Sequence, residues 1–107
     1  MDEVTVTPAY ALSVGLKGMF VVQVTDDSMV EYSLCEGDIL LVKESDDPDD
    51  GDIAVVSVNG ECCLRKIRYV VYSRVSLLAG NTKVRSRTVR REDLVVYGVV
   101  KGVFRAL

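Results

Sequence analysis

Short runs of valine, isoleucine and leucine alternate with polar residues along most of the chain, and glycine, aspartate, asparagine and proline separate the runs. A period of two and a high content of β-branched residues are typical of strands that bury one face. No window keeps a helical period over the length of a normal helix. The pattern predicts strands over residues 19–25, 38–43, 52–58, 61–70, 74–79 and 94–105. We therefore expect a mainly β fold, a single domain of twisted antiparallel sheets.

Turn-forming residues lie between the predicted strands. Asn59-Gly60 separates two apolar runs and is the preferred dipeptide of a two-residue type I′ hairpin. Ala79-Gly80-Asn81 marks another turn, and the acidic residues 44–50 indicate an exposed loop. Residues 28–34 are expected to form a short helical turn that Ser28 can cap.

Residues 1–18 have no clear period, so we expect an N-terminal arm ahead of a domain over residues 19–107. A chain of 107 residues that is 49% hydrophobic and 27% charged is typical of one globular domain. Its net charge of −3 argues against a general nucleic-acid binder. The apolar runs are shorter than the roughly 20 residues that cross a bilayer, and the acidic N-terminus does not resemble a signal peptide. We expect a cytoplasmic protein with no membrane partner.

The chain holds three cysteines, Cys35, Cys62 and Cys63, and no histidine. Cys62 and Cys63 are neighbours in a predicted strand, so their side chains point to opposite faces and are poorly placed for a disulfide. The C-x-x-C spacing of many zinc sites is missing. We expect three reduced thiols, most of them in the core, and neither a metal ion nor a cofactor.

Ser28 is the residue with the strongest chemical interest. It follows the apolar run that ends at Val24 and precedes a turn-rich stretch before Gly37-Asp38. A serine at the end of a strand can present its hydroxyl to a cleft, although most such serines only form a turn. Because the chain has no histidine, a nucleophilic Ser28 would need another base, and lysine is the usual substitute.

An ordered set of short motifs accompanies this serine: Asp27-Ser28-Met29, Gly37-Asp38, Gly51-Asp52-Ile53, Asn59-Gly60-Glu61, Val96-Tyr97-Gly98-Val99-Val100 and Phe104-Arg105. Over residues 19–105 the set resembles the C-terminal domain of the LexA, UmuD and phage-repressor group. These are the S24 serine–lysine self-cleaving peptidases, which carry Gly-Asp-Ser-Met around the nucleophile. The resemblance implies a LexA/signal-peptidase-like fold, with Ser28 as nucleophile and Asp27 and Met29 in the cleft. Backbone N–H groups around Ser28 would then contact the oxyanion.

The resemblance also implies where the base should stand. In the group a lysine follows the second Gly-Asp by thirteen residues, which leads from Asp52 to Arg65. A buried lysine can lose its proton, whereas arginine keeps its proton because its intrinsic pKa lies above about 12. Lys66 is the alternative base, but alternation along a strand sends it to the face opposite Arg65 unless a bulge re-aims it. We therefore expect a peptidase fold with weak or no activity.

Two other stretches have alternative interpretations. The basic residues Lys83, Arg85, Arg87, Arg90 and Arg91 predict a solvated strand and loop. They could instead form a phosphate-contacting patch, or face the acidic loop of a second subunit. The apolar run from Leu94 to Phe104 predicts a core strand, while the resemblance implies that this end of the domain helps form a two-fold dimer contact.

The main hypothesis is a C-terminal dimerisation and regulatory domain of a LexA- or phage-repressor-like transcription regulator of the SOS type, with impaired autocleavage. Such a homodimer would reach DNA only through an N-terminal helix-turn-helix domain outside this chain. The usual self-cleavage bond would fall before Met1, and the Ala79-Gly80 pair lies in a predicted turn. One alternative is an active serine–lysine autopeptidase that uses Lys66. Another is a stand-alone UmuD-like protein whose partner is a polymerase or a recombinase filament.

Overall fold

A computed structural model describes residues 4–6 and 17–105 of the chain. The described residues form one antiparallel sheet of eight strands in the order β1-β2-β3-β8-β4-β5-β6-β7. The strands are β1 (Val4–Val6), β2 (Met19–Val24), β3 (Ile39–Glu44), β4 (Ile53–Val58), β5 (Glu61–Val70), β6 (Arg74–Leu78), β7 (Arg87–Arg90) and β8 (Leu94–Phe104). Two single-turn 3₁₀ helices, η1 (Val30–Tyr32) and η2 (Arg91–Asp93), complete the described elements. The predicted mainly β, antiparallel fold is confirmed.

All six strands predicted from the alternating pattern are present, with ends that agree within one residue. β7 lies inside the basic stretch, where a solvated strand and loop were expected. β1 was not predicted, and it pairs with β2 at one edge of the sheet. The other residues of the predicted arm before Lys17, 1–3 and 7–16, lie outside the described residues, so the division into arm and domain stays a prediction.

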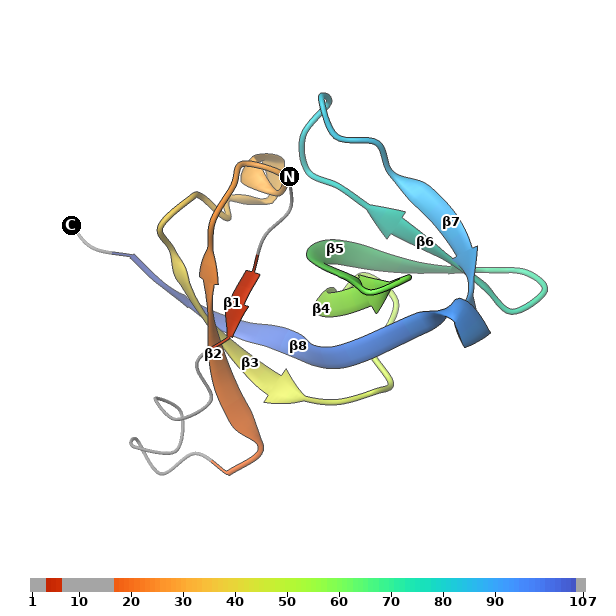
Figure 1. The fold of residues 1–107 in the computed structure, drawn as a ribbon, viewed down its shortest axis with the longest axis horizontal. Coiled ribbons are helices and arrows are strands. Elements are labelled where there is room, and N and C mark those ends of the chain that lie inside the picture. Colours follow the sequence, from red (N-terminus) through yellow and green to blue (C-terminus); the bar gives the residue numbers. More distant parts are fainter. Residues whose placement is uncertain (1–3, 7–16, 106–107) are drawn as a thin grey trace.

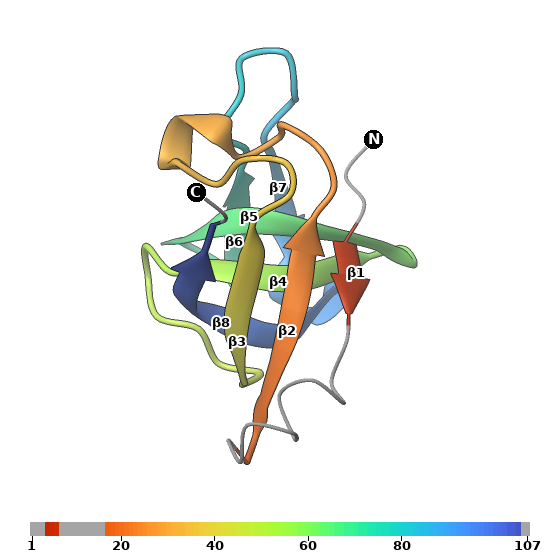
Figure 2. The same ribbon diagram turned by 90° about the vertical axis from the view of Figure 1, so that its left-hand side faces the viewer.

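The sheet is strongly twisted around its longest strand, β8. β8 pairs with β3 along its C-terminal half and with β4 along its N-terminal half. Figure 1 shows β8 running along the long axis of the molecule, and Figure 2 shows β1–β3 lying across the direction of β4 and β5. The register shifts between Leu41 and Val42 and between Val55 and Val56, and such bulges increase strand twist.

Gly98 permits the close approach of β3 at this bend. A Cβ atom on Gly98 would lie 2.6 Å from the Lys43 carbonyl oxygen and 2.6 Å from Val42 Cγ1. No side chain could stand there without moving the β3 backbone. The glycine in the middle of an otherwise apolar run is therefore explained by strand packing.

Two clusters of buried apolar side chains divide the core. The first is built mainly on β2, β3 and the residues after Ser28, and comprises Phe20, Val22, Val24, Met29, Leu34, Leu40, Val42, Val55 and Leu64. The second is built on β4, β5, β6 and β8, and comprises Ala54, Val56, Val58, Ile67, Val75, Leu77, Leu94 and Val96. Alternate residues of β4 and β5 enter different clusters, as the period of two requires.

Local conformations follow the expected turn chemistry with one exception. Asn59 and Gly60 both have positive φ, 52° and 82°, which confirms the type I′ hairpin. The predicted helical turn is present as η1, but its N-cap residue is Met29 and no side chain caps it. The prediction that Ser28 caps this turn is therefore wrong.

Among the described residues, no helix is long and apolar enough to cross a membrane.

Candidate functional site

Ser28 lies in the segment between β2 and η1 and is 3% exposed. The loop that follows β6 holds this segment by its backbone. The Gly80 N–H donates to the Ser28 carbonyl oxygen at 2.7 Å, and the Glu31 N–H donates to the Gly80 carbonyl oxygen at 2.7 Å. Asn81 Nδ2 adds a hydrogen bond to the Asp27 carbonyl oxygen at 3.0 Å. We call these three bonds the Gly80–Asn81 clasp; Figure 2 shows the two segments side by side at the top of the molecule.

Gly80 is required in this clasp for steric reasons. A Cβ atom at this position would lie 2.7 Å from Tyr32 Cδ2 and 3.0 Å from Met29 Cα. The sequence predicted a turn at Ala79-Gly80-Asn81 but gave no sign that this turn contacts Ser28. The contact joins residues that are about fifty positions apart, which local patterns do not report.

Arg65 lies on β5 opposite Ala54, with 7% of its surface exposed. Its Nη1 donates a long hydrogen bond to Ser28 Oγ at 3.5 Å and a shorter one to the Leu64 carbonyl oxygen at 2.6 Å. Burial lowers the pKa of the Arg65 guanidinium, and the charge of Arg87 lowers it further. Arginine starts from an intrinsic pKa so high that the group keeps its proton and acts as a donor only.

Lys66, the alternative base, faces the other way. Arg65 shares its face of β5 with Cys63 and Ile67, which contribute to the second cluster, whereas Leu64 enters the first. The Lys66 ammonium lies 5.1 Å from the centre of the Tyr32 ring, a cation–π contact on η1. Among the described residues Lys66 has no hydrogen bond to Ser28. Ladder pairing is regular here, since Ile53 pairs with Lys66 and no bulge re-aims the side chain.

The two predicted cleft residues differ in exposure. Met29 is fully buried and belongs to the first cluster, so its side chain is part of the core. Asp27 is exposed, and its carbonyl oxygen accepts the bond from Asn81. Asp26, which the sequence did not single out, accepts a hydrogen bond from the Ser28 backbone N–H at its Oδ1, at 2.9 Å. The signal that could have identified Asp26 is its place in the motif, where the resembling group has glycine.

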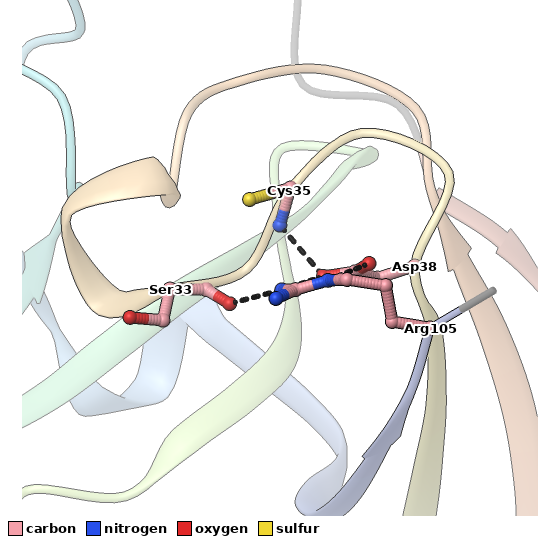
Figure 3. A network of polar contacts seen from close by, with 4 residues as sticks. All are labelled: Ser33, Cys35, Asp38 and Arg105. Atoms are coloured by element: carbon pink, nitrogen blue, oxygen red, sulfur yellow. Dashed lines mark hydrogen bonds and ion pairs between the residues drawn. The ribbon is translucent and has the colours of Figure 1, made fainter. Parts of the chain in front are cut away.

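A polar network, shown in Figure 3, fixes the other end of the segment that carries Ser28. Arg105 donates from Nε to Asp38 Oδ1 at 2.8 Å and from Nη2 to Asp38 Oδ2 at 2.6 Å. Arg105 Nη2 also donates to the Ser33 carbonyl oxygen, and the Cys35 N–H donates to Asp38 Oδ2, each at 2.8 Å. The bonds from Arg105 lower the pKa of the Asp38 carboxyl from 3.8 to about 2, although burial opposes this shift. The network ties residues 33–38 to the end of β8.

The three cysteines are unpaired with one another and half-buried. Cys62 packs against the first cluster and Cys63 against the second, on opposite faces of β5, so the prediction that they do not pair is confirmed. Two of the three thiols, Cys62 and Cys63, therefore pack against the core as expected, although they are half-buried. Burial raises the pKa of the Cys63 thiol to about 11. No group of potential metal ligands is found within the described residues.

Taken together, the geometry places a buried guanidinium, that of Arg65, as hydrogen-bond donor to a buried serine hydroxyl, that of Ser28, within a twisted antiparallel sheet. Residues 2–101 match the model of the Peptidase S24-like family, and the chain belongs to this family. The match covers the serine segment, β5 and most of β8. The resemblance inferred from the sequence motifs is thereby confirmed.

Several curated relatives with similar sequences are LexA repressors. The chain is 38% identical over 88 residues to the LexA repressor of Thermotoga petrophila, covering 82% of this chain and 44% of that protein. It is 30% identical over 107 residues to the LexA repressor of Thermotoga neapolitana, covering 100% of this chain and 53% of that protein. A third LexA repressor, from Carboxydothermus hydrogenoformans, is 30% identical over 90 residues, covering 83% of this chain and 44% of that protein. The chain therefore spans about half the length of these relatives.

Proposed function

We propose that this chain is the C-terminal dimerisation and regulatory domain of a LexA- or phage-repressor-like transcription regulator in which Arg65 impairs self-cleavage. Membership of the Peptidase S24-like family and similarity to LexA repressors support the regulatory part. The observation that carries the impaired-cleavage part is the hydrogen bond from Arg65 Nη1 to Ser28 Oγ. DNA binding would belong to a helix-turn-helix domain outside the chain.

The chemical argument concerns the direction of this hydrogen bond. A serine becomes a nucleophile when a neighbouring base accepts its hydroxyl proton. A neutral lysine amine has a lone pair for this purpose, whereas a guanidinium has five N–H donors and no acceptor. Ser28 Oγ is therefore the acceptor in its contact with Arg65, and its proton has no destination there. Burial shifts the Arg65 pKa downward, but from a starting value too high for neutral arginine to form near pH 7.

Exposed apolar side chains at the end of β8 support the proposed dimer. Val103 and Phe104 are 44% and 58% exposed. They lie at the C-terminal end of β8, and this end of the strand reaches the left side of the molecule in Figure 1. Neighbouring residues of a strand point to opposite faces, so these two side chains flank the end of β8 rather than form one patch. Apolar side chains that stay exposed in one protomer are typical of a surface covered by another protein. A second protomer related by a two-fold axis would cover them, as the family resemblance implies.

The alternative base, Lys66, is less consistent with these contacts. Its ammonium would have to leave the Tyr32 ring and cross to the opposite face of β5 to reach Ser28. The polymerase-associated alternative keeps the same domain and differs only in the partner, so the composition of complexes recovered with the intact protein separates it from a repressor.

The test of the impaired-cleavage part is Arg65→Lys. This variant should cleave an Ala-Gly peptide supplied in trans, at a rate that rises toward alkaline pH as the new amine loses its proton. The unaltered chain should show no cleavage above background. Arg68→Lys, an exposed position on the same strand, is the matched control and should behave like the unaltered chain. Equal rates for the unaltered chain and Arg65→Lys would overturn the proposal.

The test of the dimer is sedimentation velocity over a range of concentrations. Phe104→Ser should shift the chain toward a monomer, because it removes an apolar side chain from the proposed contact. Tyr72→Ser is the control, since Tyr72 is 90% exposed on the β5–β6 hairpin at the other end of the long axis (Figure 1). A dimer that is weakened by Tyr72→Ser and not by Phe104→Ser would place the contact elsewhere.

A further inference from the structure

The turn that leads into Ser28 carries a carboxylate directed back at the serine. Asp26 Oδ1 accepts the hydrogen bond of the Ser28 backbone N–H at 2.9 Å. The carbonyl group of Ser28 is also paired, because its oxygen accepts the Gly80 N–H at 2.7 Å. The backbone of the serine is therefore fixed with its own N–H already paired to an anion.

That N–H has a specific use in acyl transfer by serine. When the hydroxyl oxygen attacks a carbonyl carbon, the carbonyl oxygen becomes negatively charged, and backbone N–H groups at the nucleophile stabilise it. The N–H of the attacking serine is the nearest such donor to the reacting carbon. A carboxylate on this donor occupies the bond that the oxyanion would take. It also places a negative charge close to the negative charge that develops in the transition state.

We infer that Asp26 is a second, independent obstacle to catalysis at Ser28. Its carboxylate occupies the backbone N–H that would stabilise the oxyanion, whereas Arg65 cannot accept the proton of the Ser28 hydroxyl. This inference rests on the proposed function, since it concerns the same serine. Asp26 stands at the position where Gly-Asp-Ser-Met has glycine. A glycine there has no side chain to accept the Ser28 N–H, so the donor would remain available to a substrate.

A purely structural role for Asp26 makes a different prediction. Aspartate commonly accepts the N–H two residues further on and so stabilises a turn. If that were its whole role, replacing Asp26 would lower stability and would leave the chemistry of Ser28 unchanged or worse. If Asp26 blocks the oxyanion donor, replacing it should lower stability slightly and increase the rate of the chemical step.

The experiment uses the Arg65→Lys chain and an Ala-Gly peptide in trans. The introduced amine accepts the Ser28 hydroxyl proton while Oγ bonds to the carbonyl carbon and the C=O electron pair moves onto oxygen. Collapse of this intermediate breaks the C–N bond, the leaving amine takes the proton, and water then releases the acyl group from Ser28. Asp26→Gly added to this chain should raise kcat about 10- to 100-fold with KM changed less than about threefold, since one oxyanion donor is typically worth 10²–10³ in kcat.

Asp26→Asn separates occupancy of the donor from charge. The asparagine Oδ1 can still accept the Ser28 N–H and keep the turn, so in the Arg65→Lys chain its gain in kcat should be well below that of Asp26→Gly. Glu31→Gln, which removes a nearby exposed charge on η1, is the control and should leave kcat within about twofold. Equal gains for Asp26→Gly and Asp26→Asn would overturn the claim that the occupied N–H is the cause.

A second measurement requires no catalysis. Amide hydrogen exchange in the chain with Arg65 retained should be slow at the Ser28 N–H and should become at least tenfold faster in Asp26→Gly. Fast exchange in the unaltered chain would contradict the bond on which the inference rests.

The failures of the two proposals are distinguishable. If Arg65→Lys cleaves the peptide and Asp26→Gly adds no rate to it, the inference about Asp26 is wrong and the proposed effect of Arg65 stands. If neither variant cleaves the peptide, both the inference and the attribution of impaired cleavage to Arg65 are wrong. If the chain with both Asp26 and Arg65 unaltered cleaves the peptide as fast as Arg65→Lys, the proposal that Arg65 impairs cleavage is wrong.

Discussion

Gly80→Ala is the most direct test of the clasp that holds the serine segment. The added Cβ would lie 2.7 Å from Tyr32 Cδ2 and 3.0 Å from Met29 Cα, whereas carbon atoms normally pack at about 3.5–4.0 Å. The Tyr32 ring can turn aside, but Met29 Cα belongs to the backbone and its side chain is fully buried. The substitution therefore forces the two segments apart or strains their hydrogen bonds.

The expected cost follows from these contacts. Overpacking of a tight site costs about 1–3 kcal/mol. If the two backbone bonds of Gly80 lengthen, each loses part of a net contribution of about 1 kcal/mol. Against this, replacing glycine by alanine restricts the unfolded chain and returns about 0.4–1 kcal/mol. The net expectation is a destabilisation of about 1–3 kcal/mol, or a fall in Tm of several degrees for a domain of this size.

Urea denaturation followed by circular dichroism measures this free energy, with Gly102→Ala as the matched control. A Cβ on Gly102 would lie 3.6 Å from its nearest neighbour, Leu41 Cβ, which is ordinary contact. Gly102→Ala should therefore stay within about 0.5 kcal/mol of the unaltered chain. If Gly80→Ala is as stable as Gly102→Ala, the close packing of the loop after β6 against the serine segment is refuted.

Two further predictions concern ionisable groups. Arg105→Met should lower the urea midpoint at neutral pH, because it leaves the buried Asp38 carboxylate without its guanidinium. Since the folded pKa of Asp38, about 2, lies below its ordinary 3.8, this loss should be full above about pH 4 and should fade as the pH falls toward 2; a loss of equal size at every pH would contradict it. Arg90→Met breaks two exposed ion pairs and should have a smaller effect. Cys63, with its pKa raised to about 11, should react with iodoacetamide at pH 8 on the order of 100-fold more slowly than in the urea-unfolded chain, and comparable rates by peptide mapping would argue against its burial.

The strands could be predicted from the sequence because their signal is local. Short valine-rich runs mark β4 and β8 directly, and Asn59-Gly60 fixes the register of the hairpin between β4 and β5. β1 was missed because three residues are too few to establish a period. The helical turn was predicted, but its N-cap residue was not. Ser28 donates its N–H to Asp26 and accepts the Gly80 N–H at its carbonyl oxygen, and the turn begins after Met29.

The site was predictable only where a motif carries the information. Motif spacing led from Asp52 to Arg65, and the structure places Arg65 Nη1 3.5 Å from Ser28 Oγ. The roles assigned to these two residues remain predictions. By contrast, the bond between Arg105 and Asp38 joins residues 67 positions apart. Such a contact is decided by how the whole sheet folds back on itself, and neither residue's neighbours in the sequence indicate it.

The position of β8 has a consequence for synthesis of the chain. β8 is the last strand of the described residues, yet it lies between β3 and β4 in the sheet. Until Leu94–Phe104 have left the ribosome, β3 and β4 have exposed edges with no neighbour to pair with, and unpaired edges of this kind promote aggregation. Completion of the sheet must therefore wait until β8 itself has been synthesised, when one strand closes both halves at once.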